Sequence, residues 1–149
     1  MEQKMCGNDF CVGDEYTTAA ITVTETHVVN WACLTMDFYP LHMNKEYAAE
    51  TQFGERIAHG PLIFGMAVGL VGMAGFAGDS VIAWLGVDNM RMFLPVKIGD
   101  TIRVVVKVIE KLETKKPEKG IQVWCYTVKN QRDESVMSFD YKMMFHMRE

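Results

Sequence analysis

The chain has no excess of basic residues. Its 149 residues include 15 Lys and Arg against 19 Asp and Glu, which gives a formal net charge of -4. A protein that binds nucleic acid or an anionic membrane through its charge needs a broad basic surface, and this composition does not supply one. We therefore expect no nucleic-acid partner. Small molecules and other proteins remain as partners.

Paired cysteines are also missing. Cys6, Cys11, Cys33 and Cys125 have no CxxC spacing, and the first residues show no basic segment followed by an apolar stretch of the signal type. We expect reduced thiols in a cytoplasmic protein. Cys6 and Cys11 lack the second ligand pair of a zinc site, so we predict no metal.

Internal repeats and low-complexity linkers are absent from the sequence as well. The length suits one globular unit with a buried core, and it is too short for a catalytic domain plus a separate binding domain. We predict one domain over residues 1–149.

One long stretch, residues 60–78, contains no charged side chain, and within it Gly65 and Gly69 have the GxxxG spacing found in membrane helices. The stretch is only just long enough to cross a bilayer, its glycines lower the hydrophobicity, and no Lys or Arg cluster anchors either end. We predict a helix buried on nearly all sides in a protein core, and no membrane span.

In the C-terminal half, successive side chains alternate between two faces with the period of two that is typical of strands. The predicted strands cover residues 81–93, 102–109, 121–126 and 137–145, after a shorter one at 20–24. A sheet and a helix must each bury an apolar face. We therefore predict an α+β fold in which an antiparallel sheet of about five strands wraps around the long apolar helix.

Two shorter helices are predicted before the apolar stretch. Thr24 can cap a helix that continues through Leu34. Asn44 can cap a second one that contains residues 47–49 and closes at 53–54.

Asp37 and His42 lie between these helices, on either side of residues 38–41 (Phe-Tyr-Pro-Leu). Positions five apart are not neighbours on a helix, but a proline-bent loop can fold both side chains onto one point. Their proton affinities lie on either side of neutral pH, which suits the addition or removal of water. Gly60 begins the apolar helix, where unpaired N–H groups and the positive end of the helix dipole attract a developing oxyanion.

Five segments together match a known family. They are Val12-Gly13-Asp14, the Asp37 to His42 segment, Ile57-Ala58-His59-Gly60, the Phe93 to Asp100 segment and Asn130-Gln131-Arg132. On these residues the sequence resembles, nearly end to end, the MaoC-like or R-specific enoyl-CoA hydratase branch of the hot-dog fold proteins.

The resemblance implies a hot-dog fold and a reaction at a 2-enoyl thioester of coenzyme A, in which water is added to give a 3-hydroxyacyl thioester or is removed in reverse. The family's catalytic aspartate and histidine fall on Asp37 and His42, and either of them could be the base. The backbone N–H that polarises the thioester carbonyl falls on Gly60. Coenzyme A is then part of the substrate and no separate cofactor is implied. The family also implies a homodimer or larger homo-oligomer, which would cover the sheet edges.

Two positions depart from the family pattern. Met36 stands where the family usually has Gly, and Tyr39 stands where it usually has Asn. Because Gly permits a positive φ, Met36 predicts a changed loop conformation or a bulkier pocket wall. Tyr39 exchanges a small amide for a large ring with one hydroxyl.

Two other functions fit the same residues. A thioesterase would direct the water at the carbonyl and release a free thiol, whereas a non-catalytic acyl-CoA binding module would keep Asp37 and His42 only as relics. His59 is predicted to be structural, without a catalytic role. Methionines such as Met90 and Met92 are predicted to fill core or dimer space.

Overall fold

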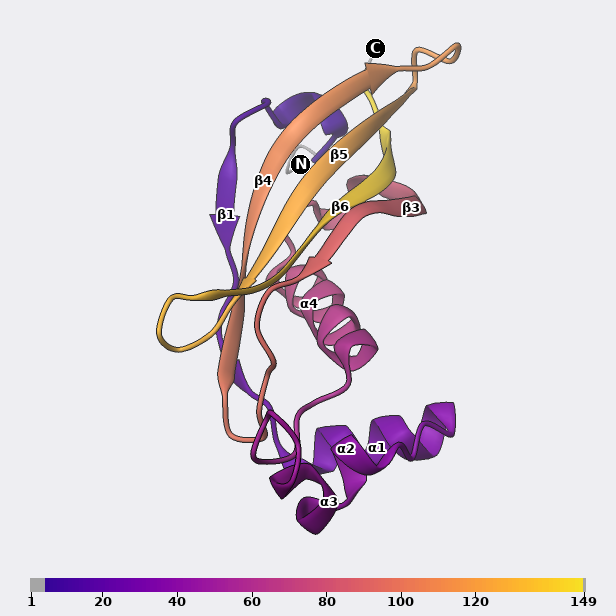
Figure 1. Cartoon of the computed structure of the whole chain (residues 1–149). Helices are drawn as coiled ribbons and strands as arrows, with labels where there is room; N and C mark the ends of the chain where they lie inside the picture. The colour runs from indigo at the N-terminus through magenta and orange to yellow at the C-terminus, as the bar shows by residue number, and fades with distance from the viewer. Residues whose placement is uncertain (1–4, 149) are drawn as a thin grey trace.

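The computed structural model describes residues 5–148, which form a curved antiparallel sheet with one long helix against it (Figure 1). The strand order is β1-β4-β5-β6-β3, and the short β2 also pairs with β4. The strands are β1 (Glu15–Thr17), β2 (Ile21–Thr22), β3 (Val81–Met92), β4 (Thr101–Glu113), β5 (Lys119–Lys129) and β6 (Ser135–His146).

The period of two places one face of each long strand in the core. In β4, alternate residues from Ile102 to Val108 are fully buried. In β6, Phe139 and Phe145 are buried in the core as well. All strand pairs are antiparallel, as predicted. The sheet has six strands, one more than predicted, because β1 was missed; β2 is shorter than the predicted strand at 20–24.

The long helix, α4 (Gly60–Ala74), packs against the sheet with Leu62, Ile63, Ala67, Leu70 and Val71 buried. It ends four residues earlier than predicted, because Gly75 takes a φ of 67° and turns the chain into the short 3-10 helix η2 (Gly78–Ser80). Burial on nearly all sides was wrong. The exposed residues of α4 are Pro61, Gly65, Gly69, Gly72, Met73 and Ala74. No helix among residues 5–148 is long and apolar enough to span a membrane.

Three shorter helices lie at the end of the sheet where α4 begins (Figure 1). They are α1 (Glu25–Thr35), α2 (Pro40–Met43) and α3 (Lys45–Ala49); a further 3-10 turn, η1 (Gly7–Asp9), lies near the N-terminus. Both predicted caps are confirmed: Thr24 forms a capping box with His27, and the Asn44 side chain accepts from the N–H groups of Glu46 and Tyr47. The helix α3 ends at Ala49, earlier than the predicted 53–54.

None of the four cysteines, all of which lie in the described part of the chain, forms a disulfide. This agrees with the predicted thiols.

Candidate active site

The segment from Met36 to Met43 folds Asp37 and His42 toward each other. Met36 ends α1 with a φ of 66° and a ψ of 14°, which turns the chain so that Asp37 lies in the following loop. Pro40 then starts α2, and His42 is on this one-turn helix instead of in the loop as predicted. The turn and the short helix, in place of a single longer one, bring the two side chains together.

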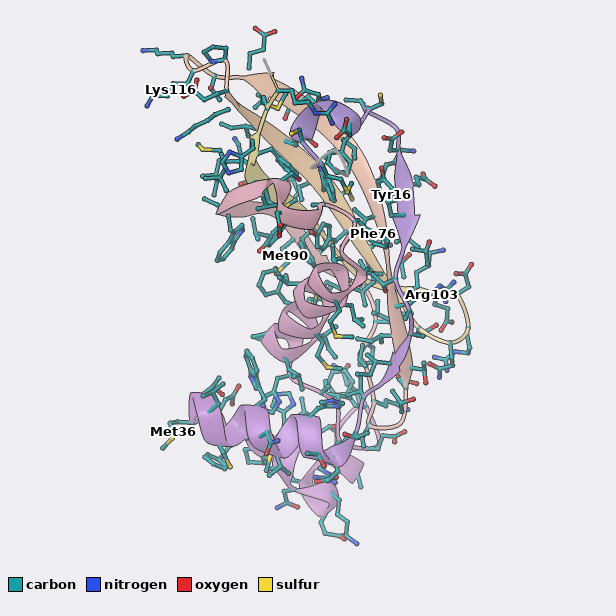
Figure 2. The ribbon with its side chains drawn as sticks, turned by 180° about the vertical axis from the view of Figure 1, so that it is seen from behind. Tyr16, Met36, Phe76, Met90, Arg103 and Lys116 are labelled. Atoms are coloured by element: carbon teal, nitrogen blue, oxygen red, sulfur yellow. The ribbon has the colours of Figure 1, made fainter. Side chains whose placement is uncertain are left out.

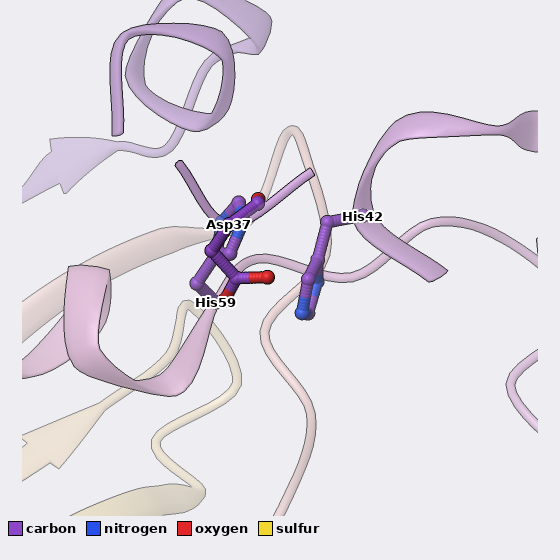
Figure 3. Close-up of side chains that lie close together, drawn as sticks. All are labelled: Asp37, His42 and His59. Carbon is purple, nitrogen blue, oxygen red and sulfur yellow. The ribbon is translucent and has the colours of Figure 1, made fainter. Parts of the chain in front are cut away.

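His59 is the third member of the group (Figure 3). One side-chain nitrogen or oxygen atom from each of Asp37, His42 and His59 lies within 4.8 Å of the others. His59 is the residue just before α4, and it was predicted to have only a structural role. The signal that could have drawn attention to it was its position beside Gly60, at the helix start that had been selected as an oxyanion site.

Both imidazoles have their tautomers set by backbone carbonyls. His42 Nδ1 lies 2.7 Å from the carbonyl oxygen of Ile57, and His59 Nε2 lies 2.9 Å from that of Asp37. A carbonyl oxygen can only accept, so each of these nitrogens carries the hydrogen. His42 therefore presents a lone pair at Nε2, and His59 presents one at Nδ1.

The environment of His42 favours its neutral form. Partial burial lowers the pKa of His42 below its ordinary value of 6.5, and the neighbouring His59 acts in the same direction. The hydrogen bond to Ile57 and the Asp37 carboxylate oppose this shift. The Nε2 lone pair is therefore available at neutral pH.

The start of α4 forms one wall of an apolar cavity of about 380 Å³. As the first residue of α4, Gly60 has an N–H without a partner inside the helix. A Cβ at Gly60 would lie 2.7 Å from Cε of Met92, so any larger residue here would displace the flexible end of that side chain. The cavity is lined by His42, Phe53, Ile57, Ala58, Gly60, Ile63, Met92, Phe93, Leu94, Pro95, Val96, Val136 and Met137. His42 is its one titratable side chain among the residues the structure describes.

The donor set of Asp37, His42 and His59 is of a type that binds divalent metals, and one ligand atom from each residue lies within 4.8 Å of the others. The two imidazoles lie side by side, with centroids 3.9 Å apart and planes tilted by 31°. That the site works without a metal stays a prediction.

The two departures from the family pattern have separate consequences. Met36 adopts the left-handed conformation that Gly would adopt without strain, and its side chain is 77% exposed (Figure 2). The exchange therefore neither removes the glycine-type turn nor adds a wall to the cavity of this chain. Tyr39 places its ring edge near His42, with centroids 6.0 Å apart, and its hydroxyl 3.4 Å from that of Tyr47.

Comparison with known proteins gives one consistent result. A family model described as "MaoC like domain" matches residues 9–130. Protein MaoC of Klebsiella aerogenes is 47% identical over 92 residues, which cover 62% of this chain and 27% of that protein. An (R)-specific enoyl-CoA hydratase of Rhodospirillum rubrum is 35% identical over 97 residues, 65% of each. The chain thus spans less than two thirds of the length of these curated relatives.

Among solved structures, a monoamine oxidase regulatory protein from Archaeoglobus fulgidus has a TM-score of 0.91 at 34% identity, covering 97% of this chain and 96% of that one. The antiparallel sheet curved around α4 is the hot-dog fold predicted from the sequence.

Proposed function

The chain belongs to the MaoC-like family, and on that premise we propose that it catalyses the reversible addition of water to a 2-enoyl-CoA, giving a 3-hydroxyacyl-CoA. One observation carries the proposal: the Nε2 lone pair of His42 and the Asp37 carboxylate lie together beside the helix start at Gly60 and the apolar cavity. The similarity to a relative named as an enoyl-CoA hydratase supports the reaction class.

Asp37 and His42 would hold the attacking water between them. In their ordinary forms both are acceptors, so one water molecule can donate a hydrogen to each and keep an oxygen lone pair for C3 of the enoyl group. As the C3–O bond forms, His42 Nε2 takes one proton. The same proton is then returned to the α-carbon, so the pair ends in its starting state and one water has been added.

Gly60 would stabilise the intermediate electron distribution. Attack at C3 shifts electrons onto the thioester oxygen, which becomes enolate-like. The N–H of Gly60 and the positive end of the α4 dipole would lower the energy of this charge, and a single preorganised donor of this kind contributes about 3 kcal/mol. Coenzyme A enters as part of the substrate, so the proposal needs no separate cofactor.

The acyl group would lie in the apolar cavity. Its lining contains no carboxylate, lysine or arginine among the described residues. An uncharged acyl chain is therefore favoured over one with a second carboxylate, because burying that charge without a partner is costly.

The test is the loss of enoyl-thioester absorbance on a panel of 2-enoyl-CoA substrates, with a free-thiol assay run in parallel. Asp37→Asn keeps the shape of the side chain and removes the charge, and Asp79→Asn makes the same change at an exposed position outside the site. We expect the absorbance to fall without thiol release, this activity to drop by about 100-fold or more in Asp37→Asn, and Asp79→Asn to behave as wild type.

Other outcomes would assign the chain differently. Thiol release that depends on Asp37 would identify a thioesterase. Tight acyl-CoA binding without turnover across the panel would identify a binding module.

We also propose that the chain forms a homodimer through β3. This strand is at the end of the sheet order, and an uncovered edge invites pairing with another strand. Trp84 and Leu85 on β3 and Met73 on α4 are exposed apolar side chains. Sedimentation should show a dimer that Leu85→Lys dissociates and that Val12→Lys, at another exposed position, leaves intact.

A further inference from the structure

His59 is a buried histidine with an unpaired nitrogen. Its side chain is 0% exposed, and its Nδ1 has no hydrogen-bond partner although it is buried, which is true of no other side-chain nitrogen or oxygen in residues 5–148. Leaving a buried polar atom unpaired destabilises the folded state. An apolar residue of similar size would avoid that cost, so the contacts of this ring call for an explanation.

The first contact joins two distant parts of the chain. His59 Nε2 donates to the backbone carbonyl of Asp37, 22 positions earlier in the sequence. That carbonyl follows Met36, whose left-handed conformation is strained for a residue with a side chain. The hydrogen bond therefore fixes the loop at the point where its backbone is least favourable, and it ties Asp37 to the start of α4.

The second contact is with the ring of His42. The two rings have centroids 3.9 Å apart and planes tilted by 31°, and the Nδ1–H of His42 donates to the Ile57 carbonyl. The ring contact and the hydrogen bond together define the plane of the His42 ring and the direction of its Nε2 lone pair.

We propose that His59 is a positioning residue of this site: its hydrogen bond holds Asp37 and its ring sets the orientation of His42. This inference rests on the proposed hydratase function, since it assigns a role in that reaction. His59 does not line the cavity, so it acts through the two residues that would contact the water.

The ring contact also has an electrostatic consequence. A charge near His42 of the same sign as its protonated ring disfavours that proton, because like charges at this distance repel. The groups that face His42 are the Asp37 carboxylate from the loop, the His59 ring, the Ile57 carbonyl and the Tyr39 ring edge. Of these, His59 helps to lower the pKa of His42. Removing the His59 imidazole should therefore raise that pKa.

Two substitutions separate the two contacts. His59→Gln keeps a donor for the Asp37 carbonyl and loses the ring, whereas His59→Phe keeps a ring against His42 and loses the donor. We expect kcat to fall about tenfold or more in His59→Phe, with KM little changed, because a misplaced catalytic group lowers the rate more than the binding. His59→Gln should retain more of kcat than His59→Phe. Both should move the acid limb of the rate profile to higher pH.

The pKa of His42, which sets the acid limb, can be measured without any substrate. The sequence has four histidines, so ring C–H signals in an NMR pH titration can be assigned by single substitutions. The pKa of His42 should rise in His59→Gln and stay unchanged in the control His146→Gln, which alters an exposed ring. If the wild type has no hydratase activity, the proposed function fails, while this titration still tests the contact between the rings.

The inference is overturned if folded His59→Phe and His59→Gln proteins, checked by thermal unfolding, keep wild-type kcat and an unshifted His42 titration. A His59→Phe protein that does not fold leaves the decision to His59→Gln, for which an unshifted titration is the negative result.

Discussion

Met92 lies directly against Gly60: a Cβ added to Gly60 would be 2.7 Å from Cε of Met92 and 3.3 Å from its Sδ. The flexible end of a methionine can move, and Met92 is half exposed, so Gly60→Ala should change the stability by less than about 1 kcal/mol. Because Met92 also lines the cavity, the displaced thioether should reduce kcat/KM about tenfold.

The double variant Gly60→Ala/Met92→Ala tests this explanation. Removing the thioether relieves the contact, so the double variant should have a higher kcat/KM than Gly60→Ala alone. Met92→Ala by itself measures the loss of the lining. If the two changes are simply additive in a double-mutant cycle, the contact between residues 60 and 92 is not the cause.

Met36 gives a prediction about stability alone. Its φ of 66° is unfavourable for a residue with a Cβ, and its exposed side chain contributes little packing. Met36→Gly should therefore stabilise the protein by about 1 kcal/mol in urea unfolding. Met73→Gly is the matched control, since the same change at an exposed position inside α4 should destabilise. A loss of stability in both variants would mean that the strain at Met36 is negligible.

The long strands were predictable because their side chains alternate over many residues. The ten or more residues in each of β4, β5 and β6 give a clear period of two, and their apolar sides become the face against α4. The strand β1 has only three residues, and its pairing with β4 depends on backbone contacts that leave no pattern in so short a segment. The same reason explains why β2 was predicted to be too long.

The candidate site was predictable in its residues but not in its connections. Asp37, His42 and Gly60 were selected from the sequence, and the structure brings all three to one end of α4. The part played by His59 depends on a ring contact and on a hydrogen bond across 22 positions, neither of which a sequence pattern records. The end of α4 was missed because residues 75–78 continue the apolar composition while Gly75 changes the backbone direction.

Gln122 connects two buried groups far from the site. Its Nε2 donates to the carbonyl of Gly7 at 2.7 Å, and its Oε1 accepts from the indole N–H of Trp124 at 2.9 Å. Gln122→Leu keeps the volume and leaves both partners unpaired, so it should destabilise the protein by about 2–4 kcal/mol in urea unfolding. Gln52→Leu, at an exposed position, should stay within about 0.5 kcal/mol of wild type. Equal effects of the two variants would contradict the assigned role of this network.

The lowered pKa of His42 makes the stability of the protein depend on pH. Burial lowers the pKa of His42 from 6.5, so in the folded chain this ring binds its proton only at a lower pH than in the unfolded chain. The stability that His42 contributes is therefore fully present above about pH 6.5 and is lost as the pH falls through the lowered pKa. The acid limb of kcat/KM should likewise lie below pH 6.5, since the proposed reaction needs the Nε2 lone pair.

Asp37→Asn should lower the pKa of His42 still further, because the Asp37 carboxylate is one of the groups that raise it. This direction is opposite to the one expected for His59→Gln, so the two variants form a matched pair around the same ring. An NMR titration of His42 in both proteins makes the comparison without substrate. A rise in the pKa of His42 in Asp37→Asn would show that this carboxylate does not act on the ring, and it would remove the basis for a water molecule shared between the two side chains.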